Sequence, residues 1–209
     1  MADSALAQRV ATALVLVAVC LPVLVFLPVS ASIALLALVV MLGAWEWSAF
    51  IERSGWIARM AYLAVIGAAI FAVRWLVPAH PGTLVIVGAG LAWWAVAFLW
   101  ILRYPRRISR LTAFVCGFLV LVPAWVALYS LAESAGKGRV LLLFALVIIW
   151  SADVGAYFAG RLWGRVKLAP SVSPGKTWEG VLGGLAFAAV AAMTGAALLG
   201  FPAATAAPL

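Results

Sequence analysis

The sequence contains little charge and few side chains suited to metal binding or nucleophilic attack. Only 10% of its 209 residues are charged, and it has two cysteines and one histidine. Cys20 and Cys116 both lie in apolar runs, which is typical of small buried hydrophobic residues without a disulfide partner. No Ser-His-Asp, Cys-His or zinc arrangement is indicated. Any chemistry must therefore rest on carboxylates, lysines and arginines.

Apolar residues are abundant instead. The chain is 68% hydrophobic and has a mean hydropathy of +1.21, whereas soluble domains contain about 45–50% apolar residues. Runs of about 20 apolar residues, long enough to cross a bilayer, recur along the whole chain. We predict an all-α, polytopic transmembrane helical bundle that forms one integral membrane domain over residues 1–209. About seven spans are expected: Val10–Leu27, Ile33–Phe50, Ile57–Val77, Leu84–Leu102, Leu111–Leu131, Val140–Phe158 and Thr177–Phe201. A signal peptide is the competing interpretation of the first run.

The positive charges predict the orientation of these spans. The net charge is +8, and the cations lie in short loops, which indicates contact with lipid headgroups and excludes nucleic acid as the expected partner. With seven spans and a cytoplasmic N-terminus, all of the 14 lysines and arginines except Arg74, Lys137 and Arg139 fall on the inner side. This bias places the N-terminus and the 160–176 loop in the cytoplasm.

Three carboxylates lie inside predicted spans, and this orientation brings all of them to the cytoplasmic face. They are Glu46, Asp153 and Glu179. An ionised group at membrane depth costs at least about 2.5–3.5 kcal/mol, so such groups usually pair, bind an ion or line a wet cavity. The coincidence indicates a site at this face. A purely structural ion pair with Arg161, Lys167 or Lys176 is the alternative.

The stretch from Trp150 to Gly184 contains most of the candidate chemistry. Asp153 and Tyr157 share one helix face by their spacing. Ser173 followed by Pro174 is typical of an N-cap with proline at the first helical position. The N–H groups of Gly175, Lys176 and Thr177 would then form a phosphate site at a helix N-terminus.

Two further patterns in this stretch have simpler interpretations. Gly175, Lys176 and Thr177 resemble the end of a P-loop, but that motif requires glycine at position 170, which is Pro170. Gly180 and Gly184 are spaced as a helix-packing pair. A cationic phosphate site beside embedded carboxylates predicts metal-assisted phosphoryl or nucleotidyl transfer onto a lipid, with carboxylates holding Mg²⁺ or another cation and lysines holding phosphates.

The stretch also resembles a known family. The segments SADVGAYFAGRLWG (151–164) and KLAPSVSPGKTWEGVLGG (167–184), together with AWEW at 44–47, are similar to the core of bacterial phosphatidate cytidylyltransferases, also called CDP-diacylglycerol synthases. The resemblance covers nearly the whole chain. It implies that CTP and phosphatidate give CDP-diacylglycerol and pyrophosphate with Mg²⁺. It further implies a homodimer among membrane lipids of the bacterial inner membrane, with the active site on the cytoplasmic side.

By position, the resemblance implies roles for individual residues. Asp153 would be the metal ligand and a catalytic carboxylate, and Lys176 and Glu179 would be catalytic. The expected substrate-binding residues are Lys167, Ser173, Gly175, Thr177, Tyr157 and Arg161.

One part of the family pattern is missing. The family has a further charged signature beyond this segment, and no charged residue follows Glu179 here. We therefore expect the chain to be C-terminally truncated relative to the family and to lack part of the active site. The alternatives are another lipid-modifying CTP-dependent kinase, or a non-catalytic small membrane transporter or scaffold.

Overall fold

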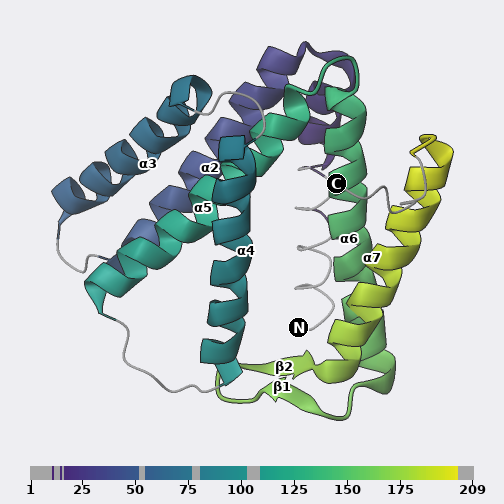
Figure 1. Cartoon of the computed structure of the whole chain (residues 1–209). Helices are drawn as coiled ribbons and strands as arrows, with labels where there is room; N and C mark the ends of the chain where they lie inside the picture. Colours follow the sequence, from purple (N-terminus) through teal and green to yellow (C-terminus); the bar gives the residue numbers. More distant parts are fainter. Residues whose placement is uncertain are drawn as a thin grey trace. The chain divides into compact units, whose positions relative to one another are not determined.

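The computed structural model describes residues 11, 15, 17–51, 55–76, 81–102 and 109–201. Long helices dominate this part of the chain (Figure 1). Six of the described helices are long and apolar enough to cross a membrane, which confirms the predicted helical membrane fold. They are α2 (Val29–Ile51), α3 (Trp56–Leu76), α4 (Pro81–Leu102), α5 (Arg110–Ala132), α6 (Gly138–Trp163) and α7 (Trp178–Leu198).

The ends of the predicted spans shift by a few residues, and the first span is only partly visible. A shorter apolar helix, Val17–Phe26, lies within it, and the rest of that span falls largely outside the described residues. The basic loop at 103–107 and the cations Arg9 and Arg53 also fall outside them. The cytoplasmic N-terminus therefore stays a prediction.

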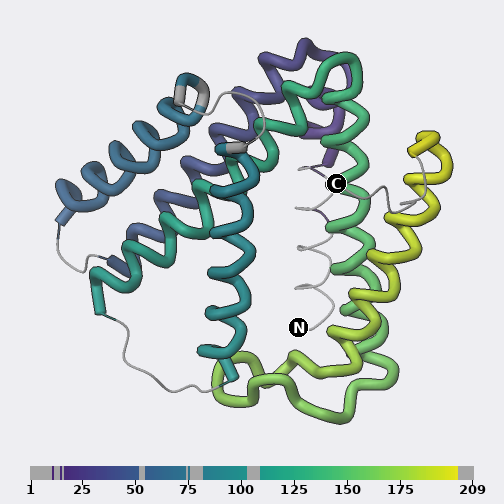
Figure 2. Tube along the Cα trace, in the orientation of Figure 1, coloured from purple at the N-terminus to yellow at the C-terminus, as the bar shows by residue number. Residues whose placement is uncertain are grey.

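The chain divides into two compact units. The first comprises Met1–Ala95 and Arg107–Arg139, and the second comprises Val96–Arg106 and Val140–Leu209. In the tube view (Figure 2), the colour changes from purple in α2 through blue in α3 and teal in α4 to green in α5, so the order of the helices along the chain can be followed. Since α4 is divided at Ala95, its last turns belong to the second unit.

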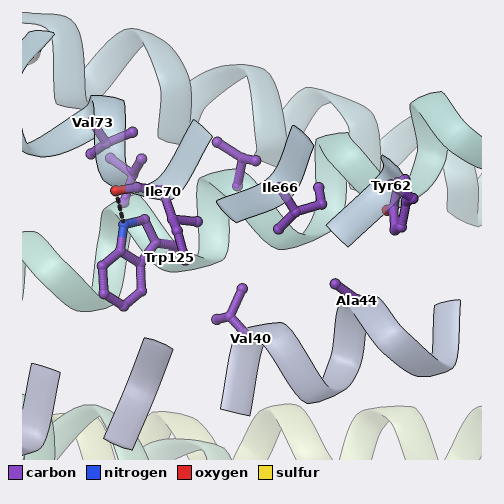
Figure 3. Close-up of a cluster of buried hydrophobic side chains, with 9 residues drawn as sticks. Val40, Ala44, Tyr62, Ile66, Ile70, Val73 and Trp125 are labelled. Carbon is purple, nitrogen blue, oxygen red and sulfur yellow. Dashed lines mark hydrogen bonds between the residues drawn. The ribbon is translucent and has the colours of Figure 1, made fainter. Parts of the chain in front are cut away.

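The core of the first unit lies between α2, α3 and α5 (Figure 3). Ala44 of α2, Ile66 of α3 and Val126 of α5 are fully buried in this cluster. The indole of Trp125 donates a hydrogen bond of 3.1 Å to the backbone oxygen of Ile70. This bond satisfies a polar group that would otherwise be costly to bury in an apolar core.

The second unit is built on a close contact between α6 and α7, which run side by side (Figure 1). A methyl group added at Gly155 would lie 2.6 Å from the backbone oxygen of Gly183, and one at Gly184 would lie 3.0 Å from that of Ala152. A methyl group at Gly180 would lie 3.1 Å from the backbone oxygen of Ala156. Small residues therefore let the two backbones touch, and the predicted packing role of Gly180 and Gly184 is confirmed.

Replacing Gly183 with leucine should destabilise the second unit. A methyl group at this position would already overlap Ala159 and lie 2.8 Å from the oxygen of Gly155. Overpacking of this kind typically costs about 1–3 kcal/mol. We expect a lower thermal midpoint in detergent, measured by the loss of monodisperse protein on heating.

Gly88 provides the matched control, since it also lies within a long helix but a methyl group there would meet no atom within 4 Å. Gly88→Leu should leave the midpoint unchanged. Equal midpoints for Gly183→Leu and the native chain would contradict the close contact between α6 and α7.

Candidate functional site

A cavity of about 640 Å³ lies in the second unit, between α6, the segment after it and the start of α7. Its volume is within the range of about 300–1,000 Å³ that is common for small-molecule sites. The α6 wall is formed by Asp153, Ala156, Tyr157, Gly160 and Arg161. These positions follow the i, i+3, i+4, i+7, i+8 spacing of one helix face, as predicted for Asp153 and Tyr157.

Arg161 and Tyr157 interact within this wall. The Arg161 guanidinium donates a hydrogen bond of 2.7 Å to the Tyr157 hydroxyl and lies 5.9 Å from the centre of its ring. Tyr157 thereby orients a cation at the cavity. No ion pair involves Asp153 in the described part of the chain, which disfavours the alternative of a structural pair with Arg161, Lys167 or Lys176.

The opposite wall contains a β-hairpin that the sequence did not predict. Strand β1 (Lys167–Ala169) pairs antiparallel with β2 (Ser173–Thr177). The turn between them is closed by a hydrogen bond of 3.1 Å from Val172 N–H to the Ala169 oxygen. Pro170 takes the second position of this turn, where its fixed φ is favoured.

The hairpin corrects the predicted helix start. Ser173 and Pro174 lie in β2, and α7 begins at Trp178 with Thr177 as its N-cap. The Thr177 hydroxyl accepts a hydrogen bond of 3.2 Å from Gly180 N–H. The prediction was wrong because Ser-Pro satisfies the local rule for a cap, whereas pairing with β1 holds the same residues in an extended conformation.

The N-terminus of α7 is therefore not the predicted phosphate site. Trp178 N–H donates to the Val166 oxygen at 2.9 Å, and Gly180 N–H donates to Thr177. The chain's own oxygens thus satisfy these donors. The N–H groups of Gly175 and Lys176 belong to a strand and lie before the helix end, whereas Thr177 is both the last residue of the strand and the N-cap of α7.

Lys176 lies where the register of the hairpin shifts, and it lines the cavity. The pairs Lys167↔Thr177 and Ala169↔Ser173 leave only Leu168 on β1 opposite Pro174, Gly175 and Lys176 on β2. A bulge bends its strand and changes the direction of its side chains, as is often seen beside active sites. Ser173, Gly175, Lys176 and Thr177 all line the cavity.

The structure thus brings together seven of the nine predicted site residues. They are Asp153, Tyr157, Arg161, Ser173, Gly175, Lys176 and Thr177. Lys167 and Glu179 do not line the cavity: Lys167 is exposed in β1, and the Glu179 carboxylate accepts hydrogen bonds from Val166 N–H. Glu46 belongs to the first unit, so it is not part of this wall.

Five lining residues were not predicted. Ala156 and Gly160 could have been found by extending the helix face from Asp153, and Gly180 was assigned to packing alone. Leu168 and Val181 reach the cavity through the hairpin and the early turns of α7. No pattern in the sequence marks these two residues.

The cavity lining contains one carboxylate of the kind that binds Mg²⁺ together with phosphates. Among the described residues there is no group of three or more His, Cys, Asp or Glu side chains that could hold a metal alone. Mg²⁺ is commonly bound by one or two carboxylates together with substrate phosphates. Asp153 is a carboxylate in the lining and fits this mode.

Comparison with known proteins identifies the class of protein. A model of the Cytidylyltransferase family matches residues 7–207, and the chain belongs to this family. It is thus a multi-pass membrane member of a nucleotidyltransferase family, with a cavity that contains one carboxylate and two cations.

The names of similar proteins indicate a more specific group within this family. The chain is 38% identical over 186 residues to a phosphatidate cytidylyltransferase of Pseudomonas aeruginosa, covering 87% of this chain and 67% of the relative. It is 36% identical over 209 residues to the enzyme of that name from Haemophilus influenzae, covering 90% and 71%. A Brucella suis phosphatidate cytidylyltransferase is 32% identical over 161 residues, covering 77% and 54%. These findings confirm the resemblance noted in the sequence. No solved structure matches the chain.

Proposed function

We propose that this chain transfers the cytidylyl group of CTP to phosphatidate, giving CDP-diacylglycerol and pyrophosphate. The observation that carries the proposal is the cavity of the second unit, in which Asp153 lies with Lys176 and Arg161. Membership of the cytidylyltransferase family and the names of the relatives support the choice of CTP and phosphatidate.

The reaction is a displacement at phosphorus. A phosphatidate oxygen attacks the α-phosphorus of CTP, the new P–O bond forms, and the bond to pyrophosphate breaks. Catalysis of such a step is mostly positioning and electrostatic stabilisation. Lys176 and Arg161 neutralise phosphate oxygens in the cavity, and Tyr157 holds the Arg161 guanidinium in place through their hydrogen bond of 2.7 Å.

Asp153 would hold Mg²⁺ together with phosphate oxygens of the substrate. Bound there, the ion would draw charge from the triphosphate and favour departure of pyrophosphate. Asp153 lies ten residues before the end of α6, about 15 Å along the helix axis. The carboxylate therefore lies within the membrane-spanning helix and faces the cavity, where an embedded charge is best tolerated.

The remaining expectations concern the membrane location and the oligomeric state of the enzyme. We propose a location in the bacterial inner membrane, with the hairpin and cavity opening on the cytoplasmic side, as the distribution of cations supports. The family resemblance also supports a homodimer. Cysteine labelling of the hairpin in spheroplasts and cross-linking in native membranes would test these two statements.

An activity assay tests the proposed function. The purified chain in liposomes, either alone or together with the C-terminal segment of a family member, should form CDP-diacylglycerol from phosphatidate when CTP and Mg²⁺ are supplied. ATP in place of CTP should give no product, whereas phosphorylated lipid formed from ATP or CTP would support a lipid kinase. Absence of CDP-diacylglycerol from a well-folded, inserted chain both with and without that segment would contradict the proposal.

A further inference from the structure

Glu179 is a carboxylate that lies beside the cavity without lining it. Its two oxygens are 3.1 and 3.2 Å from the backbone nitrogen of Val166, which donates to them. The Val166 oxygen in turn accepts from Trp178 N–H at 2.9 Å. The first turn of α7 thus holds both backbone groups of Val166, and we name these contacts the Val166 clasp.

The clasp closes the base of the hairpin. Val166 immediately precedes β1, and Trp178 immediately follows β2. The next contact inward is the strand pair Lys167↔Thr177. Because the bulge that contains Lys176 follows directly, the position of the Lys176 amine depends on where the clasp holds the two strands.

Neighbouring contacts hold the start of α7, where it meets the base of the hairpin, in place. Thr177 is only 5% exposed, and its hydroxyl oxygen would lie 3.3 Å from a methyl group added at Gly160 or at Gly180. The Trp178 ring packs edge-on against Phe98, with 6.1 Å between ring centres. The start of α7 is therefore held by α6 and by the end of α4, and Glu179 connects the hairpin to it.

Resting on the proposed function, we propose that Glu179 is a positioning residue that holds the start of β1 and, through the pairing of β1 with β2, keeps Lys176 at the cavity. Its oxygens face a backbone donor and not the cavity. A negative side chain in the first turn of a helix is also stabilised by the helix dipole. A glutamine would keep a carbonyl acceptor for Val166 N–H, whereas alanine would keep none.

The first test compares Glu179→Ala with Glu179→Gln in liposomes containing phosphatidate, with CTP and Mg²⁺. Glu179→Ala should lower kcat/KM by roughly 10- to 100-fold, as expected for a displaced binding group, with a raised KM for CTP. Glu179→Gln should recover most of this loss and keep the native pH profile. Glu133→Ala, which removes an exposed glutamate from the first unit, should behave as the native chain.

These outcomes separate positioning from two other roles. A carboxylate that bound metal or accepted a proton could not be replaced by an amide, so a Glu179→Gln variant as inactive as Glu179→Ala would overturn the proposal. A merely structural role would reduce the active fraction. A lowered kcat with an unchanged KM for CTP in Glu179→Ala would therefore overturn it too.

The second test does not depend on turnover. Hydrogen exchange of peptides covering 164–177 should be faster in Glu179→Ala than in the native chain, while peptides from the middle of α6 and α7 stay unchanged. Unchanged exchange in the hairpin would overturn the proposal. If the native chain formed no CDP-diacylglycerol even with the C-terminal segment of a family member supplied, the proposed function would fail, and this exchange experiment would still decide whether Glu179 holds the hairpin.

Discussion

Replacing Lys176 with alanine is expected to abolish turnover while leaving membrane insertion intact. Lys176 lines the cavity from β2, and we propose that its amine binds the triphosphate there. Loss of one preorganised group that stabilises transition-state charge typically lowers kcat by about 10²- to 10³-fold. Lys176 is an exposed residue of a strand, so removal of its amine leaves no buried polar group without a partner.

Two further variants sharpen the Lys176 experiment. Lys176→Arg keeps the charge but places it differently, so partial activity is expected. Lys137→Ala removes an exposed lysine from the first unit and should leave kcat and KM unchanged. Turnover and insertion are measured on the same liposomes, by product formation and by protease protection. Native turnover in Lys176→Ala would contradict the assignment of Lys176 to the phosphates.

The membrane-spanning helices could be predicted well from the sequence. Each is an apolar run longer than the roughly 18 residues that a bilayer requires, and the spacing of loop residues separates one run from the next. Only the ends of the helices differ from the prediction. α6 continues to Trp163, five residues beyond the predicted end at Phe158, because Gly160 and Arg161 are compatible with a helix that emerges from the bilayer.

The hairpin could not be predicted because each of its two strands is extended only through pairing with the other. Ser173 and Pro174 satisfy a rule for helix starts that considers only neighbouring residues. Their extended conformation depends on β1 and on the turn at Pro170. A two-stranded ribbon of this length is at best marginally stable alone, and here it is closed at its base by the start of α7.

The candidate site was predictable where it follows a helix. The face of α6 from Asp153 to Arg161 results from helical geometry alone. Once Asp153 is identified, the helical spacing predicts the other residues of this face. The opposite wall depends on the bulge, which no spacing in the sequence reveals. Lys176 was chosen for its charge and does line the cavity, but it does so from a strand and not from a helix end.

The second large effect is expected for Asp153. Asp153→Asn keeps the size of the side chain and removes its charge within α6, at a position that faces the cavity. If Asp153 holds Mg²⁺ with the substrate phosphates, kcat/KM should fall at least ~10²-fold, since metal assistance supplies several kcal/mol of charge stabilisation. Folding should not suffer, because the carboxylate makes no ion pair within the described residues.

The dependence on metal concentration distinguishes this role from simple electrostatics. Asp153→Glu retains a carboxylate at a shifted position, so its activity should be partly restored by raising Mg²⁺ or by Mn²⁺, whereas Asp153→Asn should not respond. The control is Glu133→Gln, an equal loss of charge at an exposed site of the first unit. A variant at Asp153 that weakens CTP binding equally with and without Mg²⁺ would contradict a metal ligand and leave only an orienting role.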